Sequence, residues 1–286
     1  MTQATPFEPH RRPLTGLAYR MLGSLSDAED VVQDAFLRWH TLPAADIGNP
    51  RAYLVRIVTR LCLDHLKSAR VRRETYVGPW LPEPVLNAAA LHPETPGELA
   101  DDISVALLLA LERLSPPERA AFLLHDVFDR DFAEIAATLN RSEPACRQLA
   151  ARARVHIRAQ KRFPADPAEG QRLAAAFLHA AQTGNIATLT SLLAPAATLH
   201  SDGGGQRTAA LNIIIGADKI ARFTAGVVRK TPPAMTVTPA TLNGLPGFIL
   251  TQPNGDLRTI AFETADGVIS AIYLVANPDK LRRVVQ

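Results

Sequence analysis

The chain has 286 residues, of which 47% are hydrophobic and 21% are charged, and its formal net charge is +3. This composition supports packed cores and excludes a disordered chain, and the length accommodates two or three domains. The small net charge is the sum of separate acidic and basic segments. An acidic cluster at residues 27–34 is followed by a basic stretch at residues 51–73. We therefore expect several different partners rather than one uniformly charged surface.

Residues 13–40 show helical periodicity twice, with a Gly-Ser break between the two segments. In the second segment Val31 belongs to the apolar stripe, which leaves Asp30, Gln33 and Asp34 on the outer side. Acidic residues near a helix start also suit the helix dipole. A protein interface and simple helix electrostatics therefore both explain this cluster.

A long basic helix is predicted to begin at Asn49-Pro50. Its basic residues lie mainly on the outer side or at the end: Arg56, Arg60, Lys67, Arg70, Arg72 and Arg73. Their number exceeds what a helix dipole requires and favours contact with nucleic acid.

The next stretch, residues 76–102, is rich in proline, which forbids a continuous helix. It contains the sequence WLPEP at residues 80–84, in which a tryptophan is followed by two prolines. This segment is too apolar and too stiff for a mere spacer, so we expect it to dock onto another part of the protein.

Residues 131–154 predict two short helices joined by a tight turn, a helix-turn-helix. Asn140 suits the left-handed turn position, and Ser142 suits the N-cap of the second helix. From Arg141 to Arg162 the charges are almost all basic. An ordinary helical hairpin with a solvated face is the alternative, but such a face normally mixes both signs, whereas phosphate binding rewards one sign.

Helices are also expected at residues 103–114 and 115–127, ahead of the helix-turn-helix. Beyond residue 164, two helices at 167–183 and 185–193 precede strand-like segments, with a further helix near 217–228. The strand-like segments are 197–201, 207–212, 235–242, 248–252, 257–263 and 268–275. Helices followed by a mostly antiparallel curved sheet imply a separate α+β domain.

Cys62 and Cys146 both fall on apolar helix faces, so we expect reduced buried thiols. No Cys/His spacing resembles a zinc site, and we expect neither a metal nor a cofactor. The first residues lack the apolar core of a signal peptide, and no apolar run reaches membrane-spanning length. We therefore expect a cytoplasmic protein with no membrane partner.

Three motifs occur in an order that resembles regions two and four of an extracytoplasmic-function (ECF) sigma factor: DAEDVVQDAFLRW, NPRAYLVRIVTR, and the segment from LSPPERAAF through the helix-turn-helix. WLPEP, DGGG at residues 202–205 and NPDKL at residues 277–281 narrow the resemblance to the group with a C-terminal SnoaL-like domain. Members of that group usually carry Lys after DGGG, where this chain has Gln206.

The resemblance implies two all-α modules, a region 2 helical bundle and a region 4 helix-turn-helix, followed by an α+β SnoaL-like cone domain. The implied division is 1–75 for region 2, 76–102 for the linker, 103–164 for region 4 and 165–286 for the C-terminal domain. The implied partners are core RNA polymerase, bound by the Asp30, Gln33 and Asp34 face, and promoter DNA. The basic helix would read the minus-ten element, and the second helix of the helix-turn-helix would read the minus-thirty-five element. Its implied DNA contacts are Arg141, Arg147, Gln148, Ala151, Arg152 and Arg154, with Gln148 and Arg152 as candidates for base edges.

The resemblance also implies that the C-terminal domain regulates the sigma factor within the same chain. The residues implied in these regulatory contacts are Trp80, Leu81, Pro82, Asp202, Gly203, Gly204, Gly205, Asn277, Pro278, Asp279, Lys280 and Leu281. Glycines at 203–205 allow a loop to approach another surface closely, and WLPEP is the surface we expect.

Two other functions stay open. One is a free-standing ligand-responsive helix-turn-helix regulator, and the other is an enzyme, a SnoaL-like cyclase or isomerase fused to a DNA-binding region. His200 and Asp202 share one strand face and could form an acid/base pair, although a structural pair beside a glycine turn explains them as well. We expect no catalytic residues, and we leave open an unidentified small ligand in the C-terminal pocket.

Overall fold

The computed structural model describes residues 7–41, 48–74, 76–86, 91, 103–158, 166–230 and 234–284, except the side chains of 69–74 and 158. The chain divides into two compact units. The helical unit comprises residues 1–74 and 87–161, and the C-terminal unit comprises residues 75–86 and 162–286. This division differs from the four ranges expected from the sequence, because the first part of the linker belongs to the C-terminal unit.

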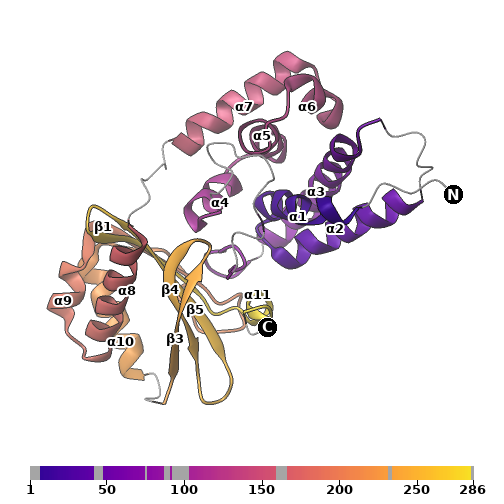
Figure 1. The fold of residues 1–286 in the computed structure, drawn as a ribbon. Coiled ribbons are helices and arrows are strands. Elements are labelled where there is room, and N and C mark those ends of the chain that lie inside the picture. The colour runs from indigo at the N-terminus through magenta and orange to yellow at the C-terminus, as the bar shows by residue number, and fades with distance from the viewer. Residues whose placement is uncertain are drawn as a thin grey trace. The chain divides into compact units, whose positions relative to one another are not determined.

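The helical unit contains α1 to α7 (Figure 1). The helices are α1 Glu8–Leu22, α2 Leu25–His40, α3 Pro50–Glu74, α4 Val105–Glu112, α5 Pro116–Phe122, η3 Leu123–Val127, α6 Phe132–Leu139 and α7 Glu143–Arg158. Local capping sets several of their ends. Gly23 ends α1 in the left-handed conformation, the Ser24 side chain accepts a hydrogen bond from Asp27 N at the start of α2, and Asp131 caps α6 in the same way.

The helix expected over residues 115–127 is α-helical only as far as Phe122. A π-helical turn, η3, follows, and Arg130 N then donates to Leu124 O at 2.8 Å. Asp129 adopts a φ of 51°, which directs the chain away from the helix axis toward α6. The apolar periodicity of these residues did not reveal this change of winding.

Arg119, on α5, is 3% exposed. It donates a hydrogen bond to the carbonyl oxygen of Met21, in the last turn of α1, and lies 3.1 Å from a Glu112 carboxylate oxygen. Burial lowers the pKa of Arg119 to about 10. A buried guanidinium group thus connects the first helix of the unit to the helices that precede the helix-turn-helix.

The C-terminal unit is a six-stranded sheet in the order β2-β1-β6-β5-β4-β3, covered on one face by three helices (Figure 1). The elements are α8 Pro167–Gln182, α9 Ile186–Ser191, β1 Leu193–Asp202, β2 Ile214–Ile215, α10 Ala217–Lys230, β3 Thr236–Leu242, β4 Leu245–Thr251, β5 Leu257–Ala265, β6 Val268–Val275 and α11 Pro278–Leu281. The pairing is antiparallel except between β1 and β6. The unit is therefore α+β with a mostly antiparallel sheet, as expected.

The strand expected at residues 207–212 is wrong. Gly203 O accepts hydrogen bonds from both Gln206 N and Arg207 N, so the chain turns tightly after β1. It pairs with β1 again only at Ile214 and Ile215, which form the short strand β2. Residues 207–212 have no ladder partner, and none of them is buried.

Aromatic side chains fill the space between the sheet and its helices. Phe262, on β5, makes edge contacts with Phe177 on α8 at 5.4 Å and with Phe248 on β4 at 6.3 Å between ring centroids. All three rings are at most 4% exposed. No helix among the described residues is long and apolar enough to cross a membrane.

Candidate nucleic-acid interface and linker-docking site

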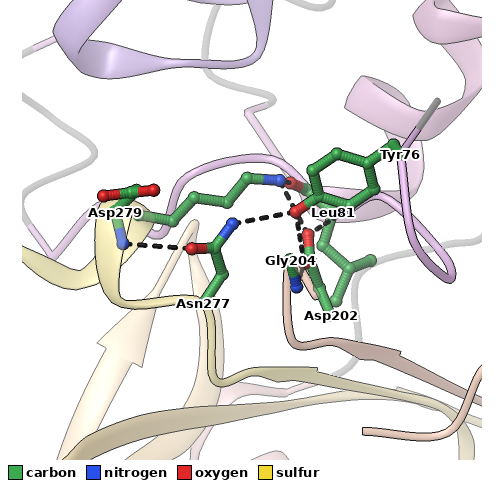
Figure 2. A network of polar contacts seen from close by, with 7 residues as sticks. Tyr76, Leu81, Asp202, Gly204, Asn277 and Asp279 are labelled. Carbon is green, nitrogen blue, oxygen red and sulfur yellow. Dashed lines mark hydrogen bonds and ion pairs between the residues drawn. The ribbon is translucent and has the colours of Figure 1, made fainter. Parts of the chain in front are cut away.

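The Asp202 carboxylate, at the end of β1, is the centre of a polar network within the C-terminal unit (Figure 2). The residue is 0% exposed. Its Oδ1 accepts from Tyr76 Oη at 2.5 Å and Gly204 N at 3.0 Å, and its Oδ2 accepts from Leu81 N at 2.8 Å and Lys280 Nζ at 2.7 Å. A buried carboxylate is stable only when it is paired and hydrogen-bonded. Asp202 therefore joins the linker, the glycine loop at residues 203–205 and the NPDKL segment at residues 277–281.

Lys280, on α11, also contacts the linker. Besides the Asp202 carboxylate, its Nζ donates to Leu81 O at 2.5 Å. The same ammonium lies 4.4 Å from the centroid of the Trp80 ring and 5.0 Å from that of Tyr76. Cation–π contacts of this kind strengthen as water is excluded. One lysine thus binds the WLPEP segment through its backbone and through an aromatic face.

Neighbouring atoms lie so close to the glycine loop that it has no room for side chains. Gly204 has a φ of 59°, and a Cβ atom there would lie 2.3 Å from Asn277 Nδ2. A Cβ atom on Gly203 would lie 2.2 Å from Arg207 O. Asn277 uses the same Nδ2 atom to donate to Tyr76 Oη at 2.9 Å. Any side chain at Gly204 would therefore displace the amide that supports the linker tyrosine.

The linker has a second point of attachment. Val85 N donates to Asn243 Oδ1 at 3.1 Å, and Asn243 N donates to Val85 O at 2.8 Å. Leu81, which belongs to the first attachment, is 0% exposed, and Glu83, between the two attachments, is 2% exposed. Sequence reasoning missed Tyr76, Val85 and Asn243. The Asn-Gly turn at Asn243 was visible as a turn signal, but nothing local connected it to the linker.

Burial raises the pKa of the Tyr76 hydroxyl above its ordinary value, and the hydrogen bond to Asp202 raises it further. The neutral phenol is therefore the form that the network stabilises, and Tyr76 acts as a donor to the carboxylate.

In the helical unit, α7 has one buried face and one exposed face. Cys146, Ala150 and Ala153 are 0% exposed and pack inward, whereas Gln148 and Arg152 are exposed. Ala151 and Arg141 are also exposed. Asn140 adopts the expected left-handed conformation, with a φ of 52°. The exposed face therefore carries long donors and small side chains, as major-groove entry requires.

Two of the DNA contacts expected on α7 are in ion pairs within the helical unit. Arg147 Nη2 lies 2.6 Å from Glu143 Oε2 on the same exposed helix face. Arg154 Nε lies 2.7 Å from Asp126 Oδ1, on η3, and its side chain is 32% exposed. A surface pair such as that of Arg147 is weak and exchanges readily for a phosphate. Arg154 is directed toward the body of the unit, which the sequence did not indicate.

The acidic face of α2 is exposed as expected at Asp30, Gln33 and Asp34. Leu37 lies on the same side and is 55% exposed. Leu37 therefore adds exposed apolar surface to a face that is otherwise acidic and polar.

On α3, Arg56 is exposed, and Lys67 pairs with Asp64 at 2.8 Å. Arg60 donates from its guanidinium group to main-chain oxygens of α6. The side chains of the other three expected contacts, Arg70, Arg72 and Arg73, lie outside the described residues.

His200 and Asp202 have separate partners. His200 Nε2 lies 3.2 Å from Thr198 Oγ1, and its ring lies 5.4 Å from that of Tyr273. The Asp202 carboxylate is engaged by four donors, which leaves it poorly placed to accept a proton as a general base. The structural role, rather than an acid/base pair, fits these contacts.

The C-terminal unit also has a surface hollow of about 480 Å³ at the start of α10. It is lined by Thr190, Leu193, Pro195, Ile215, Gly216, Ala217, Asp218 and Lys219. The aromatic core lies elsewhere, so the hollow is an open depression rather than the interior of the cone.

Two family models match the chain. Sigma-70 region 2 matches residues 7–72, and sigma-70 region 4 matches residues 104–157. The first match contains α1, α2 and α3 up to residue 72, and the second contains α4 to α7 up to residue 157.

Two proteins of Mycobacterium tuberculosis are similar to almost the whole chain. The chain is 39% identical to the ECF RNA polymerase sigma factor SigJ, over 97% of this chain and 93% of the relative. It is 33% identical to the probable ECF RNA polymerase sigma factor SigI, over 95% and 92%. The crystal structure of SigJ matches with a TM-score of 0.76 at 38% identity, covering 96% of each chain. The expected fold class is confirmed as far as two all-α modules followed by a C-terminal α+β domain.

Proposed function

The chain belongs to the extracytoplasmic-function family of RNA polymerase sigma factors, and on that premise we propose how its surfaces direct promoter-specific transcription initiation. The exposed Asp30, Gln33 and Asp34 face of α2 binds core RNA polymerase. Helix α3 contacts the minus-ten element, and α7 contacts the minus-thirty-five element. The polymerase supplies the chemistry, so this chain itself needs no catalytic group.

The helical unit must open to read both elements at once. Arg60 Nε, on α3, lies 3.1 Å from Thr138 O, on α6. The two promoter elements are separated by about 25 base pairs, or about 85 Å at 3.4 Å per base pair. A unit in which α3 is bonded to the helix-turn-helix is therefore the closed form, and polymerase binding provides the free energy to open it.

The C-terminal unit regulates this opening in cis. The docked segment begins at Tyr76, almost directly after α3 ends at Glu74. The single observation that carries the proposal is the Asp202 network, which fixes the start of the chain between the two DNA-reading regions. While Tyr76, Leu81 and Val85 stay bound, that connection is shortened and the regions have less freedom to separate. Release of the segment lengthens the connection.

The two alternatives have less support. An enzyme of the cyclase or isomerase kind needs an interior pocket with convergent polar groups. Here the interior between sheet and helices is filled by Phe177, Phe248 and Phe262. A ligand-responsive regulator needs one DNA-binding module, and this chain matches two sigma-70 regions.

In vitro transcription with purified core polymerase tests the main function. The full-length chain should give specific starts without any other sigma factor. The triple substitution of Asp30, Gln33 and Asp34 by Ala should lower these starts and weaken co-purification with core polymerase, while the circular dichroism spectrum stays the same. Normal co-purification of a folded triple variant would refute the assignment of this face.

The cis regulation is tested by a chain that ends at Pro164 and by Trp80→Ala in the full chain. Both should change the transcription rate, and Trp80→Ala should expose the linker to limited proteolysis. Leu86→Ala is the matched control, since Leu86 is a large apolar residue of the same segment that is 38% exposed. If Trp80→Ala leaves the linker protected and the shortened chain transcribes at the full-length rate, the C-terminal unit has no regulatory role.

A further inference from the structure

The outer face of α7 carries small and uncharged side chains along its centre and is basic on both flanks. Val155 is 71% exposed, more than any other large hydrophobic side chain among the described residues. Gln148 and Ala151 are exposed on the same side. These three positions are three and four residues apart, so they lie one above another on the helix.

The flanks follow from the helical repeat. Each residue turns the helix by about 100°, because one turn contains 3.6 residues. Arg147 therefore lies on one side of the line through Gln148 and Ala151, and Arg152 lies on the other side. Both arginines are exposed. A helix in a major groove directs its central line to the base edges and its flanks to the two phosphate walls.

Val155 places an apolar side chain on the exposed face of α7, in line with Gln148 and Ala151. An exposed β-branched side chain is a weak helix former and contributes nothing to the solubility of the helix. Four residues closer to the N-terminus, Ala151 adds no bulk that would keep the helix away from a surface. Within a major groove, the one apolar group presented by the bases is the C5-methyl group of thymine.

We propose that Val155 determines promoter specificity by contacting a thymine C5-methyl group in the minus-thirty-five element, with Ala151 permitting the close approach. Val155 lies seven residues from Gln148, or about 10 Å along the helix at 1.5 Å per residue. The thymine lies about three base pairs from the base that Gln148 reads, at 3.4 Å per base pair. The inference rests on the proposed role of α7 as the reader of the minus-thirty-five element.

Deoxyuridine is the sharpest probe, because it lacks the thymine methyl group and keeps every hydrogen-bonding group. After mapping one promoter by sequencing transcripts from cells that overproduce the protein, each thymine of its minus-thirty-five region is replaced singly by deoxyuridine. Full-length protein with core polymerase is then titrated onto each duplex. One replacement should weaken binding about fourfold, which corresponds to ~0.8 kcal/mol, the contribution of one buried methyl-sized group.

The variants complete a thermodynamic cycle. Val155→Ala should bind the thymine duplex about fourfold more weakly than the wild type and should show no further loss on the critical deoxyuridine duplex. His156→Ala, an exposed neighbour that lies about 100° away on α7, is the control and should keep the full deoxyuridine penalty.

Each other outcome has a defined meaning. If no single deoxyuridine weakens wild-type binding, or if Val155→Ala keeps the full penalty, the inference is wrong. If Val155→Ala lowers binding to all promoters equally with the penalty intact, Val155 contacts the polymerase and the inference is again wrong. If base-pair changes across the minus-thirty-five region have no effect on the wild type, the role of α7 itself fails. Sensitivity to base pairs without sensitivity to the methyl group overturns only the role of Val155.

Discussion

Arg60, on α3, donates a hydrogen bond from Nε to the carbonyl oxygen of Thr138 at 3.1 Å, and Nη2 donates to the neighbouring Ala137 at 3.0 Å. Both acceptors lie in the last turn of α6, where carbonyl groups have no partner within the helix. The negative end of the helix dipole adds to the attraction. A second arginine makes the same kind of contact in the opposite direction along the chain. Arg119, on α5, donates a hydrogen bond to Met21 O in the last turn of α1.

Arg60→Ala should loosen the closed helical unit. The substitution removes two charge-assisted hydrogen bonds, and since Arg60 is exposed we expect a cost of about 1 kcal/mol for the contact between α3 and α6. Amide hydrogen exchange of α6 should become faster. Arg56→Ala, an exposed arginine one turn earlier on the same helix, should leave α6 exchange unchanged. Equal exchange in the two variants would show that Arg60 does not stabilise the closed form.

The helices of the helical unit were largely predictable, because the sequence signals that start, continue and end a helix lie within a few residues of one another. The spacing of apolar residues, the left-handed Asn140 and the break at Gly23 all act over a few residues. The π-turn after Phe122 was not predictable, since the same periodicity suits both windings. The strand expected at 207–212 was wrong, because a strand also needs a ladder partner, and the sequence RTAALN contains only one strand-favouring residue, Thr208.

The candidate site was predicted in part. The stiff WLPEP segment and the glycine loop indicated docking, and the structure brings Leu81 and Asp202 together. The bond between Tyr76 and Asp202 joins residues separated by 126 positions, and that between Arg60 and Thr138 joins residues separated by 78. Such pairs depend on the tertiary fold, so no local pattern in one sequence identifies them.

Asp202→Asn should destabilise the C-terminal unit strongly. The substitution removes the buried charge that pairs with Lys280, whose side chain is 13% exposed, and loss of one partner of a buried pair costs about 3 kcal/mol or more. The free energy of unfolding, measured with urea, should fall accordingly, and the linker should become sensitive to protease.

The control is Asp256→Asn in the same unit. Asp256 pairs with Arg207 at 2.6 Å, and their side chains are 30% and 40% exposed. An exposed pair is worth about 0.2–1 kcal/mol, so this variant should be nearly as stable as the wild type. A similar small loss for both variants would mean that the Asp202 network is not a structural centre.

The docked tyrosine predicts an alkaline dependence of stability. The folded-state pKa of Tyr76 is raised, so the folded protein holds the phenolic proton more tightly than the unfolded chain. The stabilisation is present in full below the unfolded value, about pH 10, and declines as the pH rises through the folded-state pKa. Unfolding free energies of the wild type and Tyr76→Phe should therefore differ most below pH 10 and converge above it. A difference that stays constant from pH 8 to pH 11 would contradict this assignment.

Gln206 directly follows the three glycines at residues 203–205, and its Nε2 donates to Asp279 Oδ2 at 2.7 Å. Asp279 also pairs with Arg282 at 2.5 Å, and both contacts are exposed. Gln206→Lys should replace a neutral hydrogen bond by an ion pair between the glycine loop and α11, which stabilises the C-terminal unit by about 0.2–1 kcal/mol at low salt. The gain should vanish at about 1 M salt, where the Debye length is about 3 Å.

Gln206→Met, of similar length without a donor, should be slightly less stable than the wild type at both salt concentrations. Thermal unfolding of the three proteins at low and high salt measures this, and a Lys variant that is no more stable than the wild type at low salt would show that the loop and α11 are not coupled through Asp279.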